Sequence, residues 1–256
     1  MTRMLVVVAH PDDETFGCGS VLAHAAERGM QTTVWCATRG EAGEPAPGCG
    51  VEAGEQLGAA RAQELREAAG LLGVDDVVLG GFADSGMSGP APAGSLAAAP
   101  HADVVAALRE QVERVRPDLV LTLDGSDGHR DHVAVRDAAL EAAADVPWVY
   151  LQCLPRSLLQ RWVEHALRDQ PDREHLTAEV ALLGTADEDL TTRLDTGRLL
   201  DLRWQAIRTH ATQVSPFEGL PGDLQQAFLG TDHLRRVVPP WTGGPVETEL
   251  GPLAAQ

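Results

Sequence analysis

Four ionisable side chains stand within five residues near the start of the chain. The segment reads His10-Pro11-Asp12-Asp13-Glu14 and follows an apolar run. His10 and Asp13 are three residues apart, so a tight turn stiffened by Pro11 can aim both side chains at one point. An imidazole and a carboxylate are ordinary zinc ligands. Because so many ionisable groups are costly to hold together without a neutralising cation, the segment predicts metal binding.

A second cluster of histidines and aspartates occurs much later in the chain. Residues 124–132 read Asp-Gly-Ser-Asp-Gly-His-Arg-Asp-His, again after an apolar run. His129 and His132 stand where a helix is predicted to begin, so one can face a metal while the other faces a substrate. Two histidines, one carboxylate and an open fourth position are typical of catalytic zinc. Taken alone, Asp12 or Asp13 could cap a helix and His129 could lie on the surface, but the two clusters together favour one shared site.

The elements that must position both clusters repeat an order of apolar run, loop and helix. The predicted strands cover residues 4–9, 31–38, 76–80, 118–124 and 147–151. The predicted helices cover residues 17–28, 55–72, 102–116 and 132–144. Continuous apolar runs are typical of strands that are covered on both faces. The alternation predicts an α/β fold, a Rossmann-like parallel sheet with helices on both faces, whose carboxyl edge holds both clusters.

The pattern changes after residue 155. Two helices and one strand are predicted there, at 157–168, 196–212 and 177–183. We therefore expect a core with the metal site at residues 1–155. Residues 156–256 are expected to form a smaller α+β portion that packs on the core and closes the site, within one domain overall.

Composition limits the partners that the protein can have. The chain carries 38 acidic and 20 basic residues, a formal charge of −18, which repels phosphate backbones and anionic lipid. The first apolar run is too short for a signal peptide, and no stretch approaches membrane-spanning length. The four cysteines form no C-x-x-C pair. We therefore expect a cytoplasmic protein with reduced cysteines, without nucleic-acid partners or integral membrane association; whether it forms a homo-oligomer stays open.

Together the two clusters resemble the LmbE-like, or PIG-L, family of zinc-dependent deacetylases. This family includes N-acetylglucosaminyl-phosphatidylinositol de-N-acetylase, mycothiol- and bacillithiol-pathway deacetylases, and antibiotic-pathway amino-sugar deacetylases. The extended first motif at residues 10–19 and the second motif at 129–132 carry the resemblance. It covers residues 4 to about 140 and continues more faintly at 210–213.

The resemblance implies a role for each member of the two clusters. The residues that would bind one zinc ion per chain are His10, Asp13 and His132. Asp12 would act as general base, and His129 would assist at the substrate carbonyl. Asp131 would orient a histidine by hydrogen bonding.

Further positions bear on the substrate. The residues that match sugar-hydroxyl contacts of mycothiol-pathway members are Glu44, Arg61 and Asp84. Two positions depart from those members. Mycothiol S-conjugate amidases carry a lysine where this chain has Gly17, and mycothiol deacetylases carry a tyrosine where it has Asp127. The substrate can therefore be another small N-acylated amino sugar.

These observations predict an enzyme, a zinc-dependent hydrolase that de-N-acetylates an N-acetylglucosamine-like conjugate. A hydrolase of the mycothiol S-conjugate amidase type is the alternative. A non-catalytic sugar- or nucleotide-binding α/β protein is a further alternative, although no G-x-G-x-x-G follows the first strand. A serine hydrolase is disfavoured because the chain has no G-x-S-x-G. The ligand types do not separate zinc from iron.

Three weaker signals complete the prediction. Glu14 is expected to play a structural role early in a helix. His210 and Gln213, three residues apart in a late helix, either line the site or pack in the interior or at the surface. The histidines without a partner pattern are expected at the surface, at positions 24, 101, 165, 175 and 233.

Overall fold

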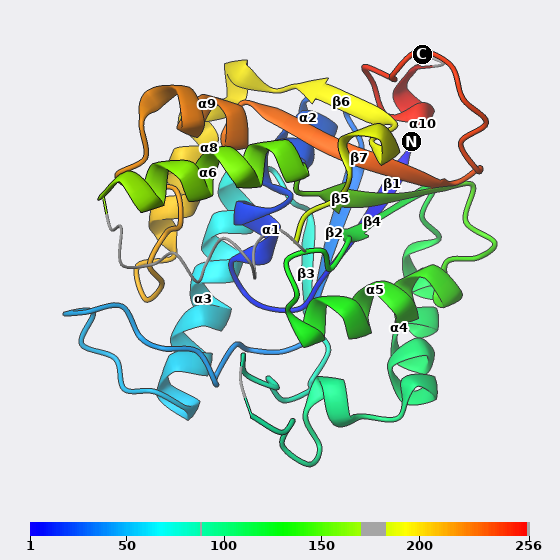
Figure 1. Ribbon diagram of the computed structural model, residues 1–256. Helices are drawn as coiled ribbons and strands as arrows, with labels where there is room; N and C mark the ends of the chain where they lie inside the picture. Colours follow the sequence, from blue (N-terminus) through cyan, green and yellow to red (C-terminus); the bar gives the residue numbers. More distant parts are fainter. Residues whose placement is uncertain (88, 170–182, 255–256) are drawn as a thin grey trace.

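A seven-stranded mixed sheet forms the centre of the molecule, which a computed structural model describes except for residues 88, 170–182 and 255–256 (Figure 1). The strand order is β3-β2-β1-β4-β5-β7-β6. The five parallel strands are β1 (Arg3–Val8), β2 (Gln31–Cys36), β3 (Asp76–Leu79), β4 (Leu119–Leu123) and β5 (Trp148–Cys153). Two antiparallel strands extend them, β7 (Thr231–Val238) and β6 (Thr192–Asp195).

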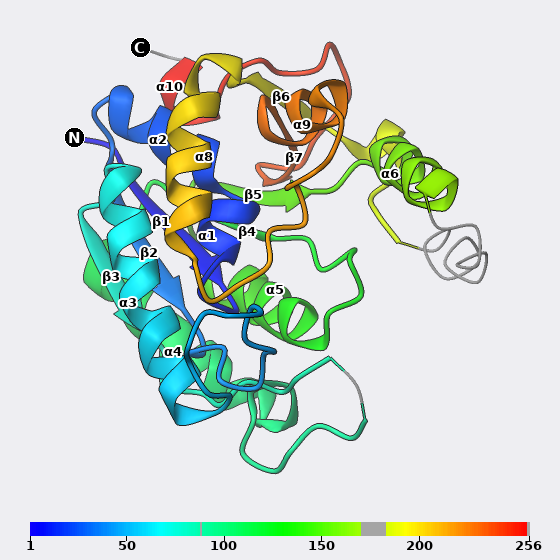
Figure 2. The ribbon, with the colours of Figure 1, turned by 90° about the vertical axis from the view of Figure 1, so that its left-hand side faces the viewer.

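Helices cover both faces of this sheet, as the apolar strands predict. Alternate side chains of β1 belong to two separate apolar clusters, with Val6 on one face and Val7 on the other. Three helices pack on the first face, α2 (Gly19–Glu27), α3 (Glu55–Leu71) and α8 (Leu200–Thr209), as Figure 2 shows. Two helices pack on the second face, α4 (His101–Val115) and α5 (Arg130–Ala142). The predicted Rossmann-like α/β architecture is confirmed.

The predicted helix at residues 17–28 begins earlier and is interrupted. α1 (Asp13–Phe16) follows the first motif directly, and α2 begins at Gly19. The Arg203 guanidinium donates to the Phe16 carbonyl at 2.6 Å and to the Thr15 carbonyl at 3.3 Å. These bonds satisfy carbonyl groups that the helix interruption leaves free. The interruption therefore depends on a residue almost two hundred positions away, which local pattern cannot predict.

The C-terminal part differs most from the prediction. Neither β6 nor β7 was expected, and β7 pairs with β5, so these residues extend the core sheet. The predicted helix at 196–212 is shorter, since α8 ends at Thr209. The predicted strand at 177–183 lies outside the described residues apart from Leu183, as does His175. The division at residue 155 stays a prediction.

The remaining elements are short apart from α6. The helix predicted at 157–168 is present as α6 (Arg156–Asp169). The others are α9 (Gly222–Leu229), α10 (Gly251–Ala254) and the 3-10 turns η1 (Leu96–Ala98), η3 (Asp187–Asp189) and η4 (Gly197–Leu199). Across the described part of the chain, every helix is too short or too polar to span a membrane. The cysteines there are free thiols, as predicted.

Arg203 and Asp232 form a buried ion pair that joins α8 to the sheet. Their side chains are 2% and 1% exposed, and Nη1 of Arg203 lies 3.1 Å from Oδ1 of Asp232. Replacing Arg203 by methionine leaves a buried carboxylate without its partner. We expect the free energy of unfolding, measured by urea denaturation, to fall by about 3–5 kcal/mol.

A surface ion pair provides the matched control. Arg161 and Asp223 lie 3.0 Å apart with side chains 49% and 72% exposed. Arg161→Met should cost less than about 1 kcal/mol, because exposed pairs contribute little. An equal fall in the free energy of unfolding in the two variants would show that burial does not determine how much Arg203 stabilises the fold.

Candidate metal centre and active site

Both motifs lie at the carboxyl edge of the sheet, beyond neighbouring strands. β1 and β4 pair in parallel, with Met4 opposite Leu119. His10 follows β1 closely, and His129 is the N-cap residue of α5, which follows β4. The imidazole of His10 consequently lies 5.4 Å from that of His132, between ring centroids, although the two are far apart in sequence.

The predicted metal ligands meet around the carboxylate of Asp13. Its Oδ1 lies 3.2 Å from Nε2 of His132, and its Oδ2 lies 3.6 Å from Nδ1 of His10. All three residues are buried, with exposures of 9%, 8% and 6% for Asp13, His132 and His10. The structure therefore brings together two imidazoles and one carboxylate in a site that excludes most solvent.

A carboxylate also holds the outward nitrogen of each histidine. Nε2 of His10 lies 3.1 Å from Oδ2 of Asp131, and Nδ1 of His132 lies 2.5 Å from Oδ2 of Asp127. When these nitrogens donate, Nδ1 of His10 and Nε2 of His132 present lone pairs toward Asp13. Nε2 of His132 is buried without any hydrogen-bond partner. A buried nitrogen without a partner beside an imidazole and a carboxylate fits a zinc ion.

Two other groups of donors converge within the described residues. The ligand atoms of His10, His129 and His132 all lie within 4.8 Å of one another, as do those of His10, Asp84 and Asp131. The second group is already engaged, since Oδ2 of Asp131 also accepts from the Ser85 amide at 3.0 Å. His129 also uses one nitrogen in the protein. In the predicted set, Oδ2 of Asp13 likewise accepts from the Ala9 and His10 amides, at 3.1 Å and 2.8 Å, whereas its Oδ1 faces Nε2 of His132.

The charges around the site favour a cation. Burial lowers the pKa of His132, but the adjacent Asp13 and Asp127 carboxylates outweigh it and raise that pKa to about 10. Burial also lowers the pKa of His10, but the carboxylates of Asp13, Asp131 and Asp84 outweigh it and raise that pKa well above its ordinary value. Without a metal, the carboxylates therefore hold protons on the imidazoles. A divalent cation can replace those protons.

Asp12 stands in a backbone conformation that few non-glycine residues adopt. Its φ is 126°, and its amide donates to Oε2 of Glu14 at 2.9 Å. Strain of this kind persists only where surrounding contacts enforce it, and it is common in active sites. Burial raises the pKa of the Asp12 carboxyl to about 6, against the opposing effect of the Arg61 guanidinium.

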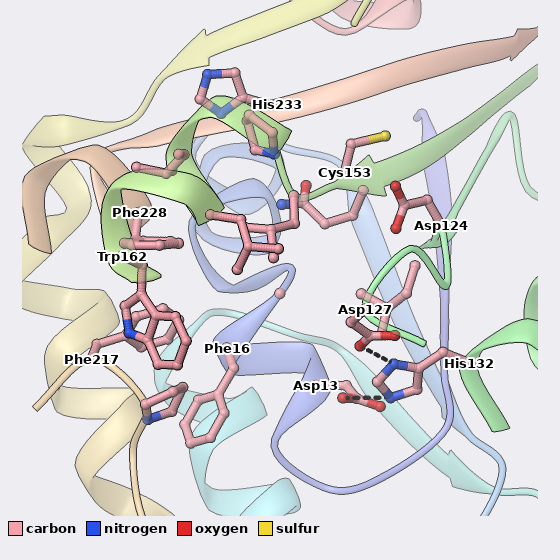
Figure 3. A pocket seen from close by; sticks show the side chains of 18 of the residues that line it. Asp13, Phe16, Asp124, Asp127, His132, Cys153, Trp162, Phe217, Phe228 and His233 are labelled. Atoms are coloured by element: carbon pink, nitrogen blue, oxygen red, sulfur yellow. Dashed lines mark hydrogen bonds and ion pairs between the residues drawn. The ribbon is translucent and has the colours of Figure 1, made fainter. Parts of the chain in front are cut away.

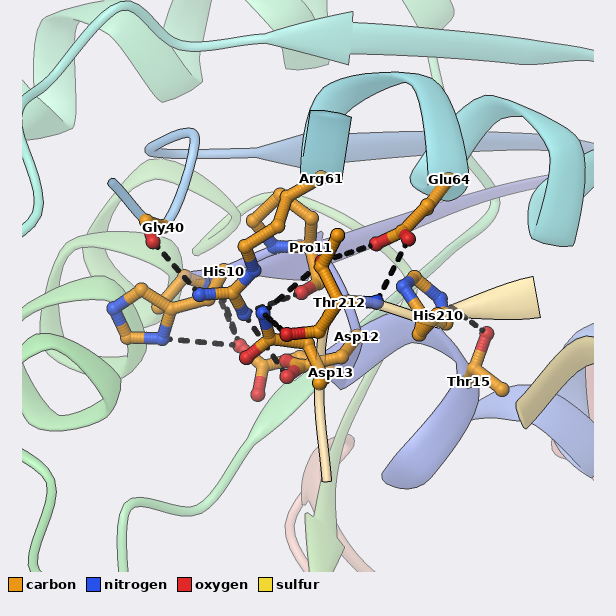
Figure 4. A network of polar contacts seen from close by, with 12 residues as sticks. His10, Pro11, Asp12, Asp13, Thr15, Gly40, Arg61, Glu64, His210 and Thr212 are labelled. Carbon is orange, nitrogen blue, oxygen red and sulfur yellow. Dashed lines mark hydrogen bonds and ion pairs between the residues drawn. The ribbon is translucent and has the colours of Figure 1, made fainter. Parts of the chain in front are cut away.

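Arg61 of α3 contacts the loop that carries Asp12 (Figure 4). Its guanidinium, 4% exposed, donates to the Pro11 carbonyl at 2.6 Å, the Gly40 carbonyl at 2.8 Å and Oδ2 of Asp12 at 2.9 Å. Two terminal nitrogens are thus used within the protein. The structure supports a positioning role for Arg61 beside the sugar contact that the resemblance implies.

The other predicted sugar contacts lie in different surroundings. Asp84 is buried next to the metal ligands, with Oδ1 lying 3.5 Å from Nε2 of His10 and accepting from the Gly86 amide at 2.8 Å. Glu44 is exposed in the loop after β2 and makes no hydrogen bond or ion pair with the described residues of the cluster. The structure therefore brings Asp84 to the site and leaves Glu44 at its margin.

His129 is oriented by the helix that it begins. Its Nδ1 accepts a hydrogen bond from the Asp131 amide at 3.1 Å. The proton of the neutral ring must therefore be on Nε2. Burial and the neighbouring His10 and His132 lower the pKa of His129. A neutral ring can still donate from Nε2, so a role at the substrate carbonyl does not require a positive charge.

A buried pair from the C-terminal part supports the first motif. Nε2 of His210 lies 2.7 Å from Oε1 of Glu14, and the pair is almost completely buried. Glu14 thereby holds the strained Asp12 amide, consistent with its predicted structural role. Thr212 donates to Glu64 on α3 at 2.6 Å and 2.9 Å. His210 therefore packs in the interior, which was one of the alternatives predicted for it.

Asp127 is the contact that sequence reasoning missed, although its position was noted as unusual. Because it holds Nδ1 of His132, Asp127→Asn should weaken zinc binding about 10–100-fold, measured with a competing chelator. Asp137→Asn is the control, since that exposed carboxylate on α5 pairs with Arg136 and not with a histidine of the site. Unchanged zinc affinity in Asp127→Asn would contradict the orienting role.

Comparisons with known proteins agree with this geometry. The family model described as GlcNAc-PI de-N-acetylase (PIG-L) matches residues 5–143. A Saccharopolyspora erythraea protein named 1D-myo-inositol 2-acetamido-2-deoxy-alpha-D-glucopyranoside deacetylase 1 is 37% identical over 83% of this chain and 78% of its own. The N,N'-diacetylchitobiose deacetylase from Pyrococcus horikoshii has a TM-score of 0.63 at 19% identity, over 92% of this chain and 84% of its own.

One structural neighbour shows that the fold alone does not define the reaction. GalB, the 4-carboxy-2-hydroxymuconate hydratase from Pseudomonas putida, has a TM-score of 0.64 at 22% identity, over 96% of this chain and 100% of its own. The site and the relatives must therefore decide the class. Together they define a hydrolytic N-deacetylase. The chain belongs to the GlcNAc-PI de-N-acetylase (PIG-L) family, and the predicted resemblance and enzyme class are confirmed.

Proposed function

We propose that the protein removes the N-acyl group from an N-acetylglucosamine-like amino-sugar conjugate, using one zinc ion held by His10, Asp13 and His132. The observation that carries the proposal is the buried Nε2 of His132, which makes no hydrogen bond and lies 3.2 Å from Oδ1 of the Asp13 carboxylate. The name of the 37% identical relative supports an amino-sugar amide as substrate. The acidic surface suits a small molecule rather than a polyanion.

The side chains around the metal site divide the reaction between them. When bound, zinc supplies a Lewis acid that acidifies water and polarises a carbonyl. Asp12, raised in pKa by burial, accepts the proton of the attacking water and then passes it to the leaving amine. His129 donates from Nε2 to the oxyanion that develops at the amide carbonyl. Arg61 holds Asp12 in place, and Asp131 and Asp127 hold the two histidines.

The amidase-type alternative involves the same reaction on a different amide. Its members carry a lysine at the position of Gly17. A Cβ atom at Gly17 would lie 2.7 Å from Cδ2 of Leu123, so a longer side chain would displace Leu123. This packing favours a deacetylase over an enzyme of the amidase type. An amine-release assay can compare an N-acetylated amino sugar with a mycothiol-type conjugate directly.

The test is a free-amine release assay with the zinc-loaded protein. The substrates are N-acetylglucosamine, its inositol glycoside and a thiol conjugate of the mycothiol type. We expect amine release from an N-acetylated amino sugar, dependent on added zinc. Release from none of these amides, by a folded protein with bound zinc, would contradict the proposed function.

A further inference from the structure

An apolar cavity opens directly from the metal centre. Its volume is about 350 Å³, and Asp13 and His132 form one end of it, as Figure 3 shows. The other end is aromatic, with Phe16, Trp162 and Phe217 close together in the same view. Neither Asp12 nor Arg61 lines this space. The cavity therefore leads away from the catalytic carboxylate while remaining continuous with two of the proposed ligands.

Many segments that are separate in the sequence contribute to the wall of this cavity. Phe16 comes from α1, Leu123 from the end of β4, and Leu158 and Trp162 from α6. Phe217 packs against rings from both parts of the chain, with its centroid 5.9 Å from that of Phe16 and 5.7 Å from that of Phe228. Because the wall is built from buried and half-buried core side chains, the space is a formed pocket.

Several polar residues of the wall have their polar atoms engaged elsewhere, although Oε1 of Gln152 is buried there without a hydrogen-bond partner. Arg203 is bound to backbone carbonyls and Asp232, and Asp124 is bound to Ser126 and Thr185. Burial lowers the pKa of His233 to about 4, so its ring is neutral at neutral pH. The cavity therefore offers few groups that could satisfy the hydroxyls of a sugar.

An amide at the metal centre has an acyl side and an amine side. Sugar hydroxyls placed in the apolar cavity would be desolvated without partners, which is unfavourable. The polar cluster of His10, Asp84 and Asp131 lies outside the cavity and suits the sugar side better. We propose that the cavity binds the acyl group of the substrate, and that this group is an apolar chain longer than acetyl. The proposal rests on the proposed function, because it places the scissile amide at the zinc site.

The test compares one sugar with acyl groups of increasing length. The kcat/KM of the zinc-loaded protein is measured for N-acetyl-, N-butanoyl-, N-hexanoyl- and N-octanoyl-D-glucosamine. Each buried methylene contributes roughly a factor of four in binding. We expect kcat/KM for the hexanoyl substrate to exceed that for the acetyl substrate by at least about tenfold, since a part of this gain can be lost to ordering the chain.

A variant that fills the cavity tests the location. Leu158→Trp should lower the ratio of hexanoyl to acetyl kcat/KM by about tenfold, because the added ring occupies chain space. Gln160→Ala is the matched control, an exposed residue on the same helix, and should leave the ratio unchanged. The wild-type series stands on its own should Leu158→Trp fail to fold.

The results that would overturn the acyl-chain proposal can be distinguished from those that would overturn the proposed function. A preference for acetyl over every longer chain overturns the acyl-chain proposal and leaves the de-N-acylase function intact. Faster turnover of octyl 2-acetamido-2-deoxyglucoside, without any gain from longer acyl groups, also overturns it, because the cavity then takes the aglycone. If none of these amides releases amine from zinc-loaded protein, the proposed function fails, and the acyl-chain proposal fails with it.

Discussion

Replacing Asp12 by asparagine is expected to lower kcat by about 10²–10⁴-fold while zinc stays bound. Asparagine keeps the size of the side chain and tolerates a positive φ, so the strained backbone at 126° can persist. The amide cannot accept the proton of water, however, and it cannot return one to the leaving amine. The measurement is steady-state kinetics on the preferred N-acylated sugar, with zinc content determined on the same sample.

A control for the Asp12 variant comes from the surface. Asp76 pairs with Arg114 at 2.8 Å, with both side chains nearly half exposed, and Asp76→Asn makes the same chemical change far from the site. It should leave kcat unchanged within about twofold. A fully active Asp12→Asn protein with one zinc bound would exclude Asp12 as the base, and His129 would then be the next candidate.

Much of the fold could be predicted because apolar patterning and burial coincide in β1, β2 and β4. These strands lie in the middle of the sheet, and covering on both faces requires uninterrupted apolar runs. β6 is an edge strand and β7 lies next to it, and both are only partly buried. β7 reads Thr-Asp-His-Leu-Arg-Arg-Val-Val, which shows neither a continuous apolar run nor clean alternation. Its pairing with β5 is therefore decided by tertiary contact.

The site residues also divide into those that local sequence indicates and those that depend on tertiary contacts. His10 and Asp13 lie in one turn, so their spacing alone indicated a common target. Asp127 was misjudged because its partner is set by the loop that returns its carboxylate to His132, which spacing does not reveal. His24 was expected at the surface but is 8% exposed and lies 2.7 Å from Glu249, a contact that spans 225 positions.

His233 shows how the same error concealed part of the cavity wall. It was expected at the surface, yet it is half-buried in β7 and lines the apolar cavity. Because β7 itself was not predicted, no sequence argument could place its side chains. The cavity is assembled from segments that include α1, β4, α6, α9, β7 and the loop around Phe217, and only tertiary structure brings these segments together.

Removing His132 should abolish both zinc retention and turnover. His132→Ala deletes one of three proposed ligands and leaves Asp13 facing His10 alone. Since bound zinc supplies several kcal/mol of transition-state stabilisation, we expect kcat/KM to fall at least about 10³-fold. Wild-type protein treated with a chelator should lose activity to the same extent and regain it when zinc is added, whereas the variant should regain none.

Thermal unfolding gives a second measure of the His132 variant that does not depend on activity. A ligand that binds only the folded state raises its stability, by about 4 kcal/mol at a thousandfold excess over Kd. Added zinc should therefore raise the Tm of chelator-treated wild-type protein and leave that of His132→Ala unchanged. His101→Ala is the matched control, because this exposed histidine pairs with Glu141 at the surface, and it should respond like wild type. An equal zinc-induced rise in His132→Ala would place the ion elsewhere, with the His10, Asp84 and Asp131 cluster as the nearest alternative.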